Sequence, residues 1–263
     1  MKILLINSSY RINGNTSRII SIFEEKFIKL SEELGLCIET EKVHLAHYKI
    51  NICRGCRVCF DKGEDKCPLG DDLLNIYDKM MQADGYVVAS PVYVEDVNGI
   101  MKNWMDRMAF NSHRPAFFGK NVMLVTTSGV QSSNHSLKTM QTAFNTWAMN
   151  VICKMKFRLG ALSEMEEIKS KYDESISRIS KSFVQGIEKK SAEKPSLYSL
   201  IVFTVQQTCW LKNQQYKDTF DYKYWEEKKW LENGCAFYFP QKSNALKVKI
   251  AKIIGKVVAA FFV

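Results

Sequence analysis

The fold is decided by residues 2–17, which read KILLINSSYRINGNTS. The first part, Lys2 to Asn7, is a short leucine and isoleucine run that ends on polar residues, as buried strands do. Residues 16–34 then repeat apolar side chains at helical spacing. A strand, a polar loop and a helix in direct succession predict the first βα unit of an α/β fold.

The same alternation continues along the chain. Further strands are predicted at residues 37–44, 85–90, 121–127 and 151–157, and helices at residues 72–82, 99–110 and 137–149. Parallel strands joined through helices form right-handed crossovers. The pattern therefore predicts an α/β doubly wound, five-stranded parallel sheet.

The part of the chain after the last predicted strand differs in composition. Residues 163–190 are helical in pattern and highly charged, and the polar segment around Pro195 indicates a boundary. Aromatic and amphipathic segments follow up to residue 263. We therefore expect an α/β domain at residues 1–190 and a helical C-terminal extension at residues 191–263.

The loop after the first strand is rich in hydroxyl and amide side chains and opens directly onto a helix. Backbone N–H groups and the helix dipole attract anions at such a position. Ser8, Asn15, Thr16 and Ser17 can donate hydrogen bonds to a phosphate, and Arg11 can pair with it. The loop matches neither the Walker nor the Gly-x-Gly-x-x-Gly pattern. A capped helix after a polar turn is the structural alternative.

Two more loops are expected at the same edge of the sheet, where open α/β folds bind their ligands. In Ser-Pro-Val-Tyr, residues 90–93, Pro91 stiffens the strand exit, so that the backbone and Tyr93 can lie against a flat ring. In Thr-Ser-Gly, residues 127–129, Gly129 permits a close approach of the backbone to a ligand. Together the three loops predict one ligand site.

These loops, with Met-Lys-x-x-x-Asp-Arg at residues 101–107, resemble the NAD(P)H-dependent FMN reductase and iron-sulfur flavoprotein family over residues 1–190. The resemblance implies a flavodoxin-like fold, FMN as cofactor, and a homodimer or larger assembly. By resemblance, the FMN phosphate is expected on Ser8, Arg11, Asn15, Thr16 and Ser17. The ring is expected near Pro91, Val92, Tyr93, Ser128 and Gly129.

The resemblance also implies an activity. A nicotinamide, NADH or NADPH, would reduce the flavin, which would then reduce a quinone, free flavin, nitro compound or protein acceptor. We expect no catalytic side chain, because the cofactor itself performs the hydride and electron steps while the protein fixes its geometry. The expected class is therefore an FMN-dependent NAD(P)H oxidoreductase.

Eight cysteines suggest thiols or metal ligands rather than disulfides in a reducing compartment. Cys53, Cys56, Cys59 and Cys67 form a C-x2-C-x2-C run followed by a Cys-Pro pair, a pattern typical of [4Fe–4S] ligation. Zinc, free thiols and a redox disulfide are alternatives. The cluster hypothesis gives a second function: an iron-sulfur flavoprotein electron carrier fed by ferredoxin.

The net charge of +9 resides largely after residue 150. We interpret it as a solvated basic surface rather than a nucleic-acid site. In residues 246–263, lysines flank a broad apolar face that is expected to pack on the protein, with peripheral membrane contact as the alternative. No apolar run reaches the ~20 residues of a transmembrane helix, and no secretory signal is recognised, so a cytoplasmic location is expected.

Overall fold

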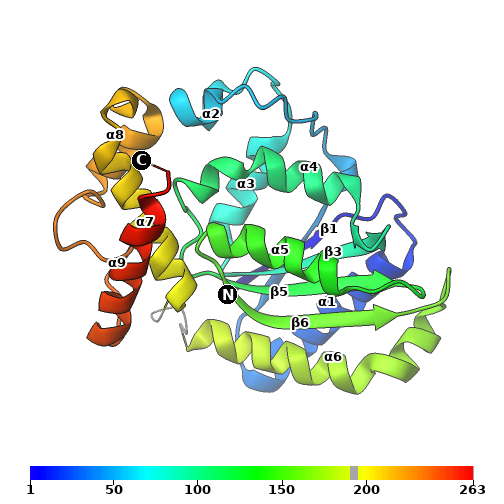
Figure 1. Ribbon diagram of the computed structural model, residues 1–263. Coiled ribbons are helices and arrows are strands. Elements are labelled where there is room, and N and C mark those ends of the chain that lie inside the picture. The colour runs from blue at the N-terminus through cyan, green and yellow to red at the C-terminus, as the bar shows by residue number, and fades with distance from the viewer. Residues whose placement is uncertain (190–194, 263) are drawn as a thin grey trace.

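A parallel sheet forms the centre of the molecule, whose computed structural model describes residues 1–189 and 195–262. Its strands lie in the order β2-β1-β3-β5-β6 (Figure 1). The strands are β1 (Lys2–Asn7), β2 (Glu39–His44), β3 (Gly85–Tyr93), β5 (Asn121–Ser128) and β6 (Asn150–Arg158). A two-residue strand, β4 (Asp96–Val97), pairs antiparallel with the end of β3. The predicted flavodoxin-like, five-stranded parallel sheet is confirmed.

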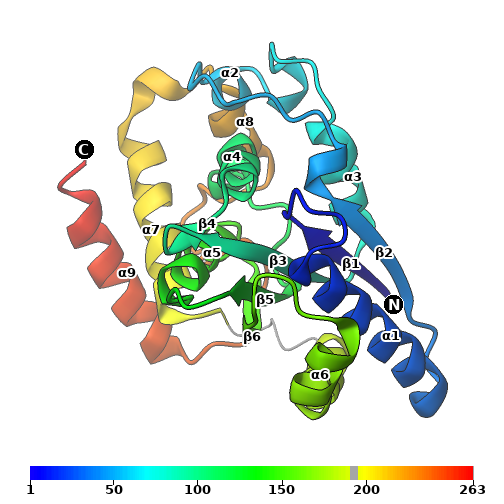
Figure 2. The ribbon, with the colours of Figure 1, turned by 90° about the vertical axis from the view of Figure 1, so that its right-hand side faces the viewer.

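Helices cover both faces of the sheet (Figure 2). On one face lie α1 (Asn15–Leu34) and α6 (Met165–Glu188), and on the other lie α3 (Leu73–Gln82), α4 (Gly99–Arg107) and α5 (Asn134–Thr146). Alternate residues of the central strands β1, β3 and β5 enter the two cores, so that Ile3 packs with α1 and α6 while Leu4 packs with the helices opposite. Burial on both faces explains why these three strands carry continuous apolar runs, whereas the edge strand β2 is mostly polar.

Element boundaries differ from the predictions by a few residues. Strand β3 runs three residues past Ser90, because β4 pairs with Val92 and Tyr93. Helix α4 ends at Arg107, after which the chain tightens into a 3₁₀ turn at Ala109–Ser112. Other short elements are the helix α2 (Val58–Asp61) and the 3₁₀ turns η1 (Leu45–His47), η2 (Glu64–Lys66) and η5 (Gln214–Tyr216).

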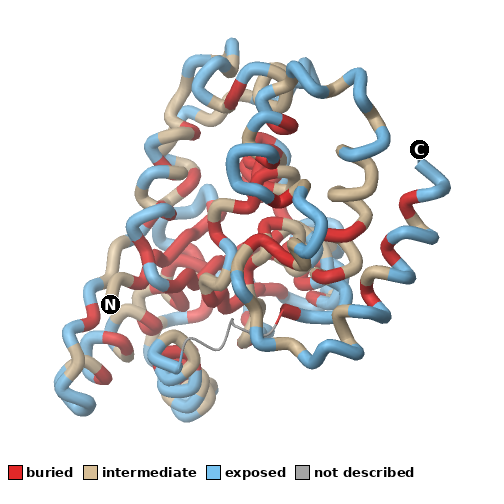
Figure 3. The backbone as a smooth tube through the Cα atoms, turned by 90° about the vertical axis from the view of Figure 1, so that its left-hand side faces the viewer, coloured by how far each residue is buried: buried red, intermediate tan, exposed pale blue. Residues whose placement is uncertain are grey.

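The C-terminal extension is helical, as predicted. It comprises α7 (Leu197–Lys212), α8 (Phe220–Glu227) and α9 (Ala245–Ala259). A separate apolar cluster holds them together: Leu200, Phe203, Trp225, Trp230, Phe237, Tyr238 and Ala251. Figure 3 shows the buried residues concentrated along the central strands, with the surrounding helices buried on one side only. The predicted boundary between residues 190 and 191 lies outside the described residues.

None of the described helices combines the length and apolarity required to cross a bilayer.

An ion-pair network secures the edge strand β2. Glu41 Oε2 lies 2.7 Å from Lys2 Nζ, and Glu41 Oε1 accepts a hydrogen bond from Lys79 of α3. These two ammonium groups hold the pKa of Glu41 below its ordinary value. The carboxylate is therefore charged in the folded chain at neutral pH, and its charge ties β2 to β1 and to α3.

Replacing Glu41 by Gln should lower the free energy of unfolding by about 1 kcal/mol at about pH 7. The stabilisation should disappear as the pH falls through the lowered pKa of Glu41, because the wild-type carboxyl is then protonated as well. Urea denaturation across a pH series measures both effects. Glu33→Gln is the control, since Glu33 is half exposed and, among the described residues, forms an ion pair with Lys29 alone. Equal losses in the two variants would contradict the prediction.

Candidate functional site

The loops that follow β1 and β3 part at the carboxyl edge of the sheet. These two strands are neighbours, yet β1 leads to α1 on one face and β3 leads to α4 on the other (Figure 2). A crevice opens where two adjacent connections leave a parallel sheet in opposite directions. The predicted phosphate loop and the predicted ring loops meet at this point.

The loop after β1 is held in shape by its own polar groups. Asn7 Oδ1 accepts a hydrogen bond from the Ser9 amide at 2.8 Å, and Asn7 Nδ2 donates to Ser17 Oγ at 2.9 Å. The Arg11 carbonyl accepts from Ser17 Oγ and from the Gly14 amide, each at 3.0 Å. The loop is therefore fixed without a ligand.

Helix α1 begins without a capping side chain. Gly14 occupies the N-cap position, and the first turn contains no acidic residue. A Cβ atom at Gly14 would lie 3.0 Å from Arg11 Cβ and 3.2 Å from the Arg11 carbonyl oxygen, so a larger residue would crowd the turn. The backbone N–H groups at the start of the helix lack intrahelical partners, and together with the helix dipole they favour an anion.

A cavity lies in front of this helix end. Four segments line it, and their residues are Ser9, Arg11, Gly14, Asn15, Thr16, Pro91, Val92, Tyr93, Thr127, Ser128, Gly129, Leu159, Gly160 and Ala161. The Thr16 and Thr127 hydroxyls lie 2.7 Å apart and join two of the segments. Among the predicted phosphate and ring residues, all except Ser8 and Ser17 line this cavity.

Ser8 and Ser17 lie behind the cavity wall. The Ser8 hydroxyl donates to the Ala89 carbonyl at 3.3 Å, and the Ser8 carbonyl accepts from Asn98 Nδ2 at 2.6 Å. Ser17 is occupied by its bonds to Asn7 and Arg11. Both serines shape the loop.

Several lining residues were missed by the sequence analysis. Ser9 stands in the same polar loop and Thr127 in the Thr-Ser-Gly motif, so residue type alone could have identified them. Residues 159–161, which follow β6, carry no such signal. They reach the cavity through tertiary contacts, in which Asn15 Nδ2 donates to the Gly160 carbonyl at 2.7 Å.

The second predicted site is a more enclosed pocket under α2. All four cysteines of the 53–67 segment line it, together with Phe60, Leu69, Leu73, Phe110 and Arg107. Each of the four cysteines is a free thiol. Within the described parts of the chain, no three His, Cys, Asp or Glu side chains converge closely enough to form a metal-ligand set. Burial, followed by the neighbouring Cys67 thiol, raises the pKa of Cys59 to about 11, so this free thiol is protonated.

A buried guanidinium faces the cysteine pocket. Arg107 Nη2 lies 3.6 Å from Cys67 Sγ and donates to Asp71 at 3.1 Å, while Nη1 donates to the Asn51 carbonyl at 2.8 Å. Burial opposes ionisation of Asp71, but the hydrogen bonds from Arg107 and two backbone amides outweigh it, and the pKa of Asp71 is lowered. One wall of the pocket therefore carries a fixed guanidinium whose charge is balanced by Asp71.

Helix α4 connects the two sites. Asn98 caps its first turn by accepting from the Met101 amide at 3.3 Å, and the same side chain bonds to Ser8 of the phosphate loop. At its other end Arg107 faces Cys67. A helix of nine residues is about 13 Å long. The cavity and the cysteine pocket are thus held at a set separation by one rigid element.

The C-terminal extension contacts the cysteine segment through a buried ion pair. Arg114 donates to Asp221 of α8, to Glu64 and, at 3.2 Å, to the Cys59 carbonyl. Its guanidinium also lies 4.7 Å from the centre of the Phe220 ring. Arg114 and Asp221 are both almost completely buried. The extension is therefore part of the structure that supports the pocket.

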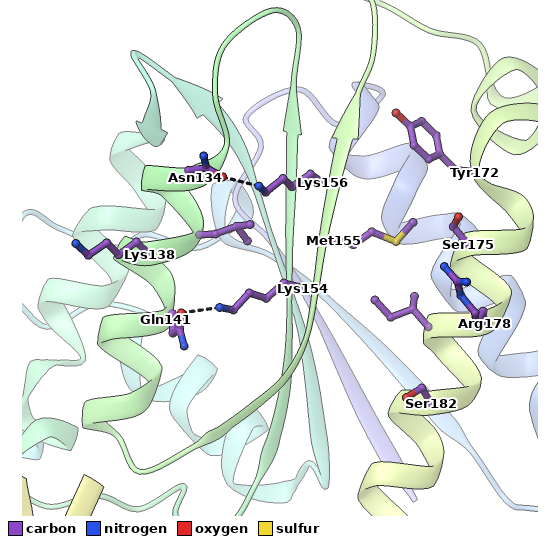
Figure 4. A pocket seen from close by; sticks show the side chains of 12 residues that line it. Asn134, Lys138, Gln141, Lys154, Met155, Lys156, Tyr172, Ser175, Arg178 and Ser182 are labelled. Atoms are coloured by element: carbon purple, nitrogen blue, oxygen red, sulfur yellow. Dashed lines mark hydrogen bonds between the residues drawn. The ribbon is translucent and has the colours of Figure 1, made fainter. Parts of the chain in front are cut away.

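A separate cleft runs along the edge strand β6, between α5 and α6 (Figure 4). It contains basic side chains, but Lys154 donates to Gln141 at 2.6 Å and Lys156 donates to Asn134. None of the predicted phosphate, ring or cysteine residues lines it. The candidate chemistry is thus confined to the carboxyl edge and the cysteine pocket.

Comparison with known proteins assigns the chain to a protein family. The sequence profile of the NADPH-dependent FMN reductase family matches residues 1–161. The chain belongs to this family. As an NADPH-dependent FMN reductase family member it is a flavin-dependent oxidoreductase, and the family's cofactor and cosubstrate are FMN and a nicotinamide.

Several proteins similar in sequence to this chain are named iron-sulfur flavoproteins. An iron-sulfur flavoprotein of Archaeoglobus fulgidus is 30% identical over 229 residues, which is 87% of this chain and 99% of the relative. One of Methanocaldococcus jannaschii is 41% identical over 107 residues, 41% of this chain and 51% of the relative. One of Methanosarcina thermophila is 30% identical over 142 residues, 54% of this chain and 70% of the relative.

Solved structures share the fold of this family member. A crystal structure of RosB with a bound riboflavin-phosphate intermediate superposes with a TM-score of 0.57 at 16% identity, covering 74% of this chain and 82% of RosB. A flavone reductase gives a TM-score of 0.56 at 18% identity, covering 72% of this chain and 63% of that protein. At these identities the likeness shows the flavodoxin-like fold.

Replacing Asp221 by Asn should lower the free energy of unfolding by about 3 kcal/mol, because it removes the buried carboxylate partner of Arg114 and leaves the guanidinium with the partly exposed Glu64. Chemical denaturation followed by circular dichroism measures the loss. The control is Asp218→Asn, which removes an exposed carboxylate just before the same helix. A loss in Asp221→Asn no larger than in Asp218→Asn would show that the buried pair is not what holds α8 to the cysteine segment.

Proposed function

We propose that the chain binds FMN in the cavity at the carboxyl edge and passes electrons through it from NADH or NADPH to a quinone, flavin, nitro compound or protein acceptor. The observation that carries the proposal is the uncapped amino terminus of α1, with Gly14 at the N-cap and Arg11 beside it. When bound, FMN would accept a hydride and release electrons. The residues of the chain would hold the cofactor in position and set the electrostatic potential around it.

The phosphate would lie on the amino terminus of α1. The amides of the first helical turn, the Thr16 hydroxyl and the Arg11 guanidinium all border the cavity there. Among the described residues, Arg11 takes part in no ion pair, and no acidic side chain lines the cavity. A dianionic phosphate therefore meets only donors and positive charge at this end.

The flavin ring would lie against residues 91–93 and 127–129. The turn after Tyr93 holds two non-glycine residues in the left-handed region, Val94 at φ 50° and Glu95 at φ 64°. For a β-branched residue this conformation costs about 1–3 kcal/mol, and such strain concentrates at ligand-binding loops. Tyr93, which is 42% exposed, is held at the rim of the cavity by this turn.

Apart from Tyr93 at the rim, the described residues of the cavity wall offer no general acid or base. Its described residues include neither His, Asp, Glu, Lys nor Cys. This composition supports the expectation that no side chain is catalytic. The residues of the wall would bind and orient the cofactor and exclude water from one side of it.

Replacing Gly14 by Asp places a carboxylate where the phosphate is proposed to lie. An Asp at the N-cap would accept hydrogen bonds from the first-turn amides, which offsets part of the crowding of its Cβ atom against Arg11. The same charge repels the phosphate, so the affinity for FMN should fall at least about tenfold further than in Gly14→Asn. Fluorescence titration of the apo-protein with FMN measures the affinity.

Gly14→Asn is the matched control, because it introduces the same Cβ atom and a cap of the same shape without the charge. Thermal denaturation checks that both variants are folded. If wild type, Gly14→Asp and Gly14→Asn bind FMN equally well, the phosphate does not lie at the start of α1.

The second candidate function adds an iron-sulfur cluster to the flavin. We propose that Cys53, Cys56, Cys59 and Cys67 hold a [4Fe–4S] cluster that exchanges electrons with FMN and is fed by ferredoxin. Four thiols lining one pocket support the proposal, as does the buried Arg107, whose Nη2 would donate a hydrogen bond to the Cys67 sulfur. The names of the similar iron-sulfur flavoproteins favour it over zinc.

Anaerobically purified chain should contain about four irons and four acid-labile sulfides per chain if this second function holds. Cys56→Ser should lose most of both, while Cys37→Ser should retain them; Cys37 is equally exposed but lies outside the pocket. The FMN content of both variants should stay unchanged. Zinc without sulfide, or equal iron in the two variants, would contradict the assignment of the ligands.

A further inference from the structure

Helix α9 packs against the protein with its small residues. Ala251, Gly255 and Ala259 are the buried positions of the helix and recur every fourth residue along one face. A Cβ atom at Gly255 would lie 2.6 Å from Thr204 Cβ of α7, so the two helices approach closely. This small face accounts for the attachment of α9 to α7.

The large apolar residues of α9 point away from the protein. Ile253 and Val257 are each 58% exposed, and Phe261 just beyond the helix is 84% exposed. Leu246, Ile250 and Ile254 are also exposed and recur at helical spacing on the same side. A surface helix of a globular protein normally buries its large apolar stripe and exposes its polar residues. In α9 this arrangement is inverted.

Lysines border the exposed apolar face. Lys249, Lys252 and Lys256 follow one another at spacings of three and four residues, which places them along one flank of the helix. In the described part of the chain none of the three forms an ion pair. Residues 233–263 contain no Asp or Glu, so no acidic side chain accompanies these lysines in the segment.

We propose that α9 docks on the surface of an anionic phospholipid bilayer. The apolar face, Leu246, Ile250, Ile253, Ile254, Val257 and Phe261, would enter the boundary between headgroups and acyl chains. The three lysines would contact the phosphates. An amphipathic helix with this composition lies in the membrane interface, where buried apolar area and attraction to anionic lipid both contribute.

Charge favours a bilayer over a second copy of the chain as the occupant of this face. Two copies packed through α9 would bring their unpaired lysine rows close together, and like charges oppose such a contact. An anionic bilayer supplies the negative charge that the segment lacks.

The position of α9 suits a docked enzyme. It lies on the outer side of α7, at the end of the molecule away from the arrowheads of β5 and β6 (Figures 1 and 2). The cavity at the carboxyl edge would therefore stay open to acceptors while α9 rests on the bilayer.

Co-sedimentation of the full chain with vesicles tests the proposal. Wild type should bind vesicles of phosphatidylcholine containing about one-third phosphatidylserine and should not bind pure phosphatidylcholine. Ile253→Ser with Val257→Ser, and separately Lys249→Gln with Lys252→Gln and Lys256→Gln, should each weaken binding at least about tenfold. All five positions lie on the helix surface, and thermal denaturation confirms folding.

Matched controls remove the same groups elsewhere. Ile28→Ser with Leu34→Ser removes exposed apolar side chains from α1, and Lys181→Gln with Lys189→Gln and Lys217→Gln removes the same charge. Both controls should bind as wild type does. No binding of wild type to anionic vesicles, or equal binding of test and control variants, would overturn the proposal. A lipid-free dimer that Ile253→Ser with Val257→Ser dissociates would overturn it in favour of a second copy.

Discussion

The parallel pairing of β1 with β3 is the constraint on which the rest of the structure depends. It joins Ile3 to Gly85 and Asn7 to Ala89, two strands that are far apart in sequence. Because β2 lies on one side of this pair and β5 on the other, right-handed crossovers place the connections after β1 and β3 on opposite faces. The crevice and the position of the start of α1 beside it both follow from this arrangement.

The polar residues around the crevice fix positions more than they perform chemistry. Asn7 shapes the phosphate loop, and Asn98 joins that loop to α4, whose other end presents Arg107 to the cysteines. On the far side of the pocket, Arg114 and Asp221 connect the cysteine segment to the C-terminal helices. The fold thus supports two sites through a few buried hydrogen-bonded groups, each of which would be costly to leave unpaired.

Much of the fold could be predicted because its signals are local. The central strands β1, β3 and β5 are buried on both faces and therefore carry continuous apolar runs, and the polar loops have distinctive residue types. The features that the sequence analysis missed depend on contacts between residues far apart in the chain. Arg114 and Asp221 are 107 positions apart, and residues 159–161 join the cavity without a chemical signature. Whether Ser8 or Ser9 faces the cavity depends on the bend that Asn7 imposes, which residue type does not reveal.

The central claim is that the cofactor is anchored by its phosphate at the start of α1. The most direct measurement compares the affinity of the apo-protein for FMN and for riboflavin, which differ only in that phosphate. Several charge-assisted hydrogen bonds to the phosphate should make FMN bind at least about 100-fold more tightly. Equal affinities for FMN and riboflavin would contradict the account.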